Sequence, residues 1–223
     1  MNYQMVKRLV WKDWYLCRQA ILVAIGAGLV CTGIVLFGGK GGFILGLIAV
    51  ITVLIGGGAY LAVQTTVMER KEKTLPFVMS LPISYREFTV AKILANLLTF
   101  LVLWLTLVFL ALFAIAIIPE LHGMVPYVAI MSVEILVNTS LVIAVAIMTE
   151  SQGWTIAAII FGNLALNGFG YYVAHIDSIG RAMWKARFCW SPAATTILLA
   201  EFVTVALLLG ATLFVQSRKT DFI

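Results

Sequence analysis

The sequence predicts an all-α integral membrane protein with six membrane-spanning helices. Of its 223 residues, 62% are hydrophobic and only 11% are charged, and the mean hydropathy is +1.06. A soluble domain is about half apolar and about a quarter charged, because its surface faces water. Six long apolar runs, separated by short breaks rich in turn-forming residues, indicate the same class. We therefore expect one polytopic transmembrane domain over residues 1–223 and exclude a soluble fold.

The six apolar runs have the length that a membrane-spanning helix requires, which is about 20 residues for about 30 Å of hydrocarbon. Backbone N–H and C=O groups find no water in lipid, so each run forms either a helix or a strand of a closed barrel. Barrel strands alternate apolar and polar residues, whereas these runs are continuously apolar. We predict helices at 20–37, 43–64, 93–118, 127–148, 153–174 and 193–215.

The distribution of Lys and Arg predicts how the chain is oriented. If the amino terminus is cytoplasmic, only four of the fifteen Lys and Arg residues fall in outer loops, namely Lys40, Arg181, Lys185 and Arg187. Cytoplasmic loops of membrane proteins are enriched in these residues. We expect a multi-pass protein of the inner or plasma membrane with both termini in the cytoplasm. The net charge of +5 is explained in this way, so we expect no nucleic acid partner.

No residue constellation in the sequence indicates catalysis. The three cysteines are odd in number and widely spaced, which predicts free thiols rather than a disulfide framework or a metal site. The only histidines, His122 and His175, fall in predicted outer loops, and no HExxH, GxSxG or complete phosphate-binding loop is present. We expect this chain not to be an enzyme and to hold no metal or cofactor.

The stretch before the first span, residues 3–19, is predicted to be a basic amphipathic helix. Val6, Val10, Trp14 and Cys17 recur at helical spacing, and basic side chains occupy the other face. Trp11 and Trp14 are of the aromatic type that favours the lipid–water boundary. We expect this helix to lie along the cytoplasmic membrane surface, and a plain juxtamembrane anchor is the alternative.

The connection between spans two and three carries signals for a short cytoplasmic helix. Thr74 can cap it, Pro76 occupies its first turn, and Pro82 ends it. Ser84 with Glu87 then forms a capping box that begins span three. The short helix exposes five apolar side chains, which favour a protein partner or the bilayer surface: Leu75, Phe77, Val78, Met79 and Leu81. The alternative is a simple turn.

This connection resembles the cytoplasmic loop of permease subunits of ATP-binding-cassette (ABC) exporters of the second type. The matching features, in order, are Glu69-Arg70, Thr74-Leu75, Leu81-Pro82, Ser84 and Lys92. The chain-wide pattern is similar as well, with Lys12-Asp13 in an amphipathic helix before six spans and a longer outer segment between spans five and six.

The resemblance implies a coupling helix that contacts a separate cytosolic ATPase subunit, where ATP and Mg would bind. It implies pairing with a second permease copy or a close relative, and export of a hydrophobic or amphipathic substrate. The residues implied in ATPase contact are Glu69, Arg70, Thr74, Leu75, Phe77, Val78, Leu81 and Pro82. Two other functions remain open: an ATP-independent secondary transporter with Glu134 as a proton site, and a nontransporting immunity or assembly module of the membrane.

The outer segment, residues 175–192, has a second amphipathic pattern. Asp177, Arg181 and Lys185 are four residues apart, which predicts contacts along one helix face and an ion pair between the first two. The apolar residues of the other face are Ile176, Ile179, Met183, Ala186 and Trp190. We expect a helix folded back on the outer leaflet, and an interfacial aromatic anchor is the alternative.

Two acids, Glu134 and Glu201, lie within predicted spans. A charge at the bilayer centre costs roughly 2.5 to 3.5 kcal/mol on insertion scales, so we expect Glu134 to face protein or water. Asn138 follows Glu134 by one helical turn, and Asn163 with Asn167 form a similar pair in span five. These polar residues could line a passage through the membrane or form hydrogen bonds between helices.

Overall fold

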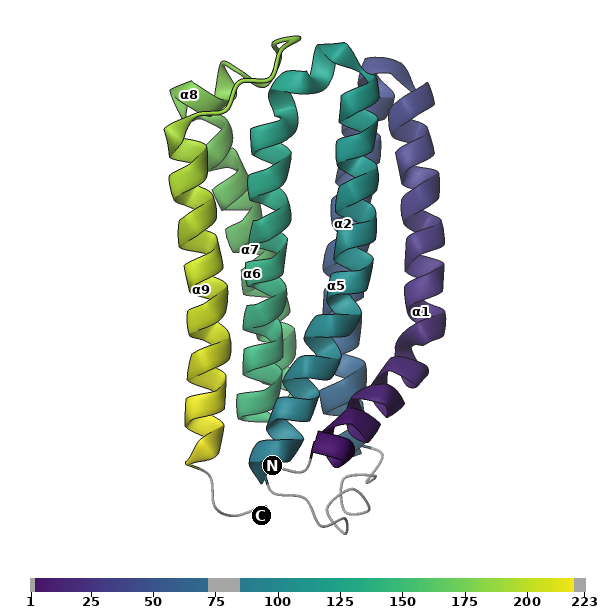
Figure 1. Ribbon diagram of the computed structural model, residues 1–223, viewed down its shortest axis with the longest axis vertical. Coiled ribbons are helices and arrows are strands. Elements are labelled where there is room, and N and C mark those ends of the chain that lie inside the picture. The colour runs from purple at the N-terminus through teal and green to yellow at the C-terminus, as the bar shows by residue number, and fades with distance from the viewer. Residues whose placement is uncertain (1–2, 72–84, 219–223) are drawn as a thin grey trace.

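The computed structural model describes residues 3–71 and 85–218, and it contains no strand in these ranges. Six of its helices are long and apolar enough to cross a membrane, as expected for a multi-pass membrane protein (Figure 1). They are α1 (Tyr3–Phe37), α2 (Gly39–Ala62), α5 (Tyr85–Ile117), α6 (Val125–Thr149), α7 (Gln152–Ala174) and α9 (Pro192–Ser217). The shorter elements are η1 (Val63–Val67), α3 (Met68–Lys71), η2 (Pro119–Met124) and α8 (Asp177–Gly180). Each predicted span coincides with one long helix to within a few residues, except that α1 and α5 begin well before theirs.

Helix α6 is the centre of the bundle. In its most apolar stretch 78% of residues are buried, against 11% to 28% for the other five long helices. It packs against α2, α5, α7 and α9, while α1 packs on the far side of α2 and α5 (Figure 1). The outward faces of the surrounding helices carry exposed side chains such as Val23, Phe109, Phe161 and Leu207. Such faces suit a hydrocarbon environment, because lipid tails replace the apolar neighbours that a soluble core would supply.

The two ends of the bundle differ in what they connect. At one end, which we call the terminal end, α1 begins, α3 ends, α5 begins and α9 ends (Figure 1). At the opposite end lie η2 and α8. The segment predicted to form the short cytoplasmic helix falls within residues 72–84, which are outside the described residues. Helix α5 begins at Tyr85, directly after the predicted capping residue Ser84.

The amphipathic stretch before span one is helical, as its pattern predicts, and it is continuous with the span. Figure 1 shows the first part of α1 inclined toward the base of α5. Its buried side chains Val6 and Leu9 pack on Ala91 of α5, whereas Trp11 and Tyr15 are exposed. The apolar side of this stretch is therefore used at least in part for contact with α5, and its position at the membrane surface stays a prediction.

The outer segment differs from the single long helix that its pattern predicts. Its helical part is the one-turn α8, which ends at Gly180, and an irregular segment follows to residue 191. Two close backbone contacts accompany this irregular course: a Cβ at Gly180 would lie 2.1 Å from the carbonyl oxygen of Ala174, and Gly123 N donates to Lys185 O at 3.0 Å. The predicted ion pair is present, with Arg181 Nη2 2.8 Å from Asp177 Oδ1. Lys185 lies beyond the helix, so its predicted place on the same face is wrong.

Candidate functional site

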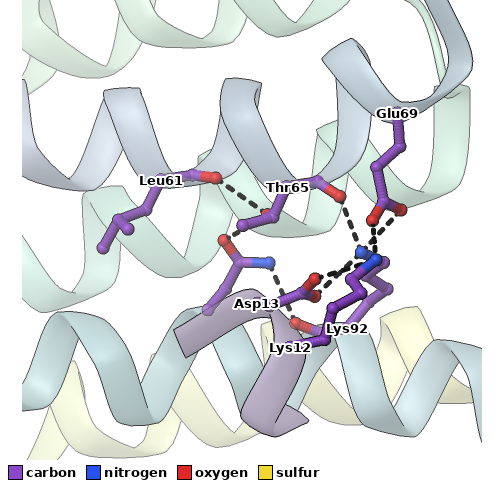
Figure 2. A network of polar contacts seen from close by, with 7 residues as sticks. Lys12, Asp13, Leu61, Thr65, Glu69 and Lys92 are labelled. Carbon is purple, nitrogen blue, oxygen red and sulfur yellow. Dashed lines mark hydrogen bonds and ion pairs between the residues drawn. The ribbon is translucent and has the colours of Figure 1, made fainter. Parts of the chain in front are cut away.

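Four charged side chains meet at the terminal end of the bundle, and we call them the terminal ion cluster: Lys12, Asp13, Glu69 and Lys92. They come from three separate helices, α1, α3 and α5 (Figure 2). Asp13, Glu69 and Lys92 are buried, whereas Lys12 is about half exposed. Two cations and two acids give the cluster a net charge of zero.

Lys92 is the centre of this cluster. Its ammonium nitrogen lies 2.8 Å from Asp13 Oδ2, 2.6 Å from Glu69 Oε2 and 2.8 Å from the Thr65 carbonyl oxygen. The ammonium group donates hydrogen bonds to Asp13 Oδ2 and to the Thr65 carbonyl, and its contact with Glu69 Oε2 is an ion pair. Lys12 pairs with the other carboxylate oxygen of Glu69 and lies 3.3 Å from Asp13 Oδ1. Both acids are therefore compensated by cations.

A π-helical turn makes one of these contacts possible. Element η1 interrupts the regular α-helical pattern between α2 and α3, and it contains Thr65. A π-turn changes the backbone hydrogen-bonding pattern, and such turns occur frequently at functional sites. The Thr65 carbonyl is available to Lys92, and the Thr65 hydroxyl lies 2.8 Å from both Leu61 O and Asn96 Oδ1. Asn96 Nδ2 in turn donates to Lys92 O at 2.9 Å, so the cluster continues into a buried polar network.

The terminal ion cluster was not predicted from the sequence, although one signal for it exists. The buried residues of the first part of α1 are Val6, Leu9, Asp13 and Cys17, so an acid occupies the buried stripe of an otherwise apolar face. An acid in such a position requires a cation nearby, because an uncompensated buried charge is costly. Lys92, at the start of an apolar span, is the matching signal.

Of the residues that the resemblance implies in ATPase contact, the structure describes two. Glu69 belongs to the terminal ion cluster, and Arg70 lies in α3 beside it. The other six lie outside the described residues, namely Thr74, Leu75, Phe77, Val78, Leu81 and Pro82. The terminal ion cluster nevertheless joins the two helices that flank this segment, because Glu69 precedes residues 72–84 by one turn and Lys92 follows them in α5.

A groove separates α2 from α7 on one side of the bundle, and we call it the α2–α7 groove. It has a volume of about 600 Å³. Asn163 and Asn167 line it from α7, Thr52 lines it from α2, and Tyr127 with Met131 contribute from α6. The side-chain N–H groups of both asparagines donate to backbone carbonyls of α7. Their amide oxygens accept no hydrogen bond within the described part of the chain, so they can accept one from a ligand.

The predicted polar residues of α6 lie elsewhere. Asn138 is buried against α7, where a Cβ on Gly162 would lie 1.9 Å from Asn138 Oδ1. Glu134 is partly exposed and is close enough to Glu201 of α9 to act on it electrostatically. The four candidates from the two spans therefore do not form one passage: Asn163 and Asn167 line the groove, and the groove's lining does not include Glu134 or Asn138.

The described residues contain no group of three or more His, Cys, Asp or Glu side chains that could hold a metal ion. All three cysteines are free. In comparisons with known proteins, no family model, no curated protein and no solved structure matches this chain.

Proposed function

We propose that this chain is the permease subunit of an ABC exporter of the second type, which transports a hydrophobic or amphipathic substrate and leaves ATP hydrolysis to a separate cytosolic chain. The sequence pattern of residues 69–92 is the origin of the proposal. The terminal ion cluster is the structural observation that supports it best, because the cluster ties both flanks of the implied coupling segment to the bundle.

The cluster gives this segment a rigid base. Glu69 lies one turn before residues 72–84 and is paired directly with Lys92, which lies within the second turn of α5. Lys92 also pairs with Asp13, so the same contacts include α1. A partner that displaces the segment would move the ends of three helices together rather than bend a loop. Coupled movement of this kind is one of the ways in which proteins transmit a conformational change.

The α2–α7 groove is the proposed place of substrate contact. Its volume of about 600 Å³ falls in the range of about 300–1,000 Å³ that is typical of small-molecule pockets. The lining is mostly apolar with a few polar groups, which matches a substrate of amphipathic character. The groove is open toward the surroundings of the bundle. We therefore propose that a second permease copy faces the groove and completes the passage.

The first experiment asks whether residues 69–81 couple the chain to an ATPase. A tagged copy is isolated from native membranes, and the associated proteins are tested for ATP hydrolysis. The variant Arg70→Glu with Leu75→Asp is then compared with wild type in proteoliposomes. We expect transport per ATP hydrolysed to fall by about tenfold, since coupling energies are typically ~1–3 kcal/mol.

The matched control for this variant is Arg187→Glu with Phe188→Asp, which likewise reverses one Arg and replaces one apolar residue by Asp, in the exposed segment of the opposite end. It should transport as wild type does. Equal transport by wild type and the 70/75 variant would contradict the assignment. Transport driven by an ion gradient without any ATPase would favour a secondary transporter, and a complete lack of flux would favour a nontransporting module.

A second experiment tests the groove. Replacing Asn163 and Asn167 by Leu removes two hydrogen-bond acceptors that face it, and we expect the apparent substrate affinity to fall by about tenfold, or ~1.4 kcal/mol. Stimulation of the ATPase by substrate is the measurement. The control is Thr204→Leu, which removes a polar group from an exposed position of α9 outside the groove. Unchanged stimulation in the asparagine variant would exclude the groove as the substrate site.

A further inference from the structure

Helix α9 buries one stripe of side chains, and an acid belongs to it. The buried residues of α9 are Ala194, Glu201, Thr212 and Gln216, whose spacing places them on one helix face. Ala194 packs in a cluster with Ile130 of α6, and Gln216 Nε2 donates to Ile147 O of α6 at 2.5 Å. The stripe therefore faces α6, and the Glu201 side chain is directed into the α6–α9 interface.

The acid that α6 contributes to the same half of the bundle is Glu134. Helices α6 and α9 both run from the opposite end to the terminal end (Figure 1). Glu134 follows Ile130 by one turn, and Glu201 follows Ala194 by two turns, so both acids lie on the same side of the Ile147–Gln216 contact. Glu134 acts on Glu201 electrostatically, which is consistent with this arrangement.

The two carboxyl groups lack the compensation that the terminal ion cluster has. Glu201 is 5% exposed, and neither of its carboxylate oxygens has a hydrogen-bond partner among the described residues. Asn138, one turn along α6 from Glu134, also has a buried side-chain oxygen without a partner in that part of the chain. A buried carboxylate without a donor or cation is costly, and two carboxylates near each other repel.

No other charged side chain lies in the middle part of the long helices around the pair. The remaining charged side chains of α2, α5, α6, α7 and α9 all lie near helix ends, as the sequence shows. The other titratable groups on the parts of α6 and α7 nearer the opposite end are Tyr127, Tyr171 and Tyr172. None of these residues carries a positive charge, so none can neutralise an ionised carboxylate.

We propose that Glu134 and Glu201 together form a proton-binding site in the membrane-spanning part of the bundle. A proton taken from water forms an O–H bond on one of the two carboxylates, and that group is then neutral. The bound proton removes the repulsion between the two acids and the cost of burying an ionised carboxylate in one step. Glu134 is the less buried of the two acids, so we assign to it the exchange of the proton with water, and the reverse step returns the proton to water.

The chemistry of the surroundings favours a proton over a metal ion. Sites for hard cations usually supply six or more oxygen ligands, including waters. The hydroxyls nearby on the same helices cannot supply the missing donor, because Ser132 Oγ donates its hydrogen to Ala129 O and Thr204 Oγ1 donates its hydrogen to Ala200 O. A proton needs only the two carboxyl groups themselves. The inference does not depend on the proposed exporter function, because it follows from the α6–α9 interface alone.

The test uses the full chain in lipid nanodiscs and the apolar reagent dicyclohexylcarbodiimide, which modifies protonated carboxyl groups in apolar surroundings. Mass spectrometry of peptides measures the modified fraction of each acid as a function of pH. We expect Glu134 or Glu201 to be modified at neutral pH. At higher pH, where the pair ionises, the rate of modification should fall by up to about tenfold for each pH unit. Glu120, which is exposed at the opposite end, is the internal control and should stay unmodified.

Two further arms show whether the acids act together and whether the ligand is a proton. In Glu201→Gln, Glu134 should lose its reactivity at a lower pH than in wild type, since the neighbouring carboxylate that opposes its ionisation is gone. Sodium and potassium ions should not protect the pair at fixed pH. No modification of either acid, modification without pH dependence, or an unshifted Glu134 profile in Glu201→Gln would overturn the proposal. Protection by sodium or potassium would also overturn it, because the site would then bind a metal cation.

Discussion

Acidic side chains are buried in two regions of the described protein, and they are paired with cations in only one of these regions. Asp13, in the terminal ion cluster, is 2% exposed and is paired with Lys92. Glu201, in the middle of the α6–α9 interface, is 5% exposed, and its oxygens have no hydrogen-bond partner among the described residues. The depth of burial is almost the same in the two cases. The comparison teaches that burial by itself does not reveal the role of an acid, whereas the presence or absence of compensating charge does.

The two arrangements have different physical consequences. In the terminal ion cluster, opposite charges hold three helices in one geometry, and the cluster is neutral with its acids ionised. In the acid pair, the favourable state depends on a bound proton, so the α6–α9 contact responds to its surroundings. We therefore interpret the cluster as a structural connection and the acid pair as a site of ligand binding.

The largest effect is expected for Lys92→Met. The substitution leaves Asp13 and Glu69 buried without their central cation, and breaking a buried ion pair in this way typically costs about 3–5 kcal/mol. Thermal or denaturant unfolding in detergent measures the loss. The control is Arg181→Met, which breaks the exposed pair with Asp177 and should cost about 0–1 kcal/mol. Equal effects of the two substitutions would show that the terminal ion cluster contributes little.

A smaller effect is expected for Gly162→Ala, which tests the packing of the polar stripe beside the acid pair. The new Cβ would lie 1.9 Å from Asn138 Oδ1, so the Asn138 side chain must move, at a cost of about 1–3 kcal/mol. Gly168→Ala is the control on the same helix, because a Cβ there has no neighbour within 4 Å. The addition of Asn138→Ala to Gly162→Ala should relieve the steric conflict. If both alanine variants are as stable as wild type, Asn138 is not fixed against α7.

The smallest effect is expected for Glu201→Gln. If the acid pair is held together by a proton, a neutral amide of the same shape should change the stability by no more than about 0.5 kcal/mol. Unfolding measured beside Lys92→Met gives the direct comparison. A loss of stability as large as that of Lys92→Met would contradict the distinction drawn between the two regions, because Glu201 would then depend on an ionised carboxylate.

The parts of the fold that were predictable from the sequence depend on local composition. The six spans follow from runs of apolar residues, and the Asp177–Arg181 pair follows from a spacing of four on one helical turn. The outer helix was predicted too long, because its pattern gives no sign that Gly180 packs on the backbone of Ala174 or that Lys185 O accepts from Gly123 N. The first contact is a close approach of the chain to its own preceding helix and the second joins segments far apart in the sequence, and an amphipathic pattern reveals neither.

The candidate sites were less predictable for the same reason. The terminal ion cluster joins Asp13, Glu69 and Lys92 from three helices, and the sequence places the three residues far apart. Both intramembrane acids were visible in the sequence, but their meeting requires α6 and α9 to run side by side. Asn163 and Asn167 were expected to share a helix face. The groove that this face lines is formed together with residues of α2, so it arises only when the bundle is assembled.

The π-turn at Val63–Val67 has a consequence for how this chain tolerates changes in length. A wide turn holds one more residue than a regular α-helical turn, so loss of a single residue at this point could be absorbed by conversion to an ordinary helix. The packing on both sides of the turn would then be kept, because the wide turn is what accommodates the additional residue. A deletion or insertion of one residue elsewhere in the span would instead rotate everything after it about the helix axis by roughly 100°. Glu69 would then point away from Lys92, and a change harmless to the hydropathy of the span would disconnect its terminal end from the neighbouring helices.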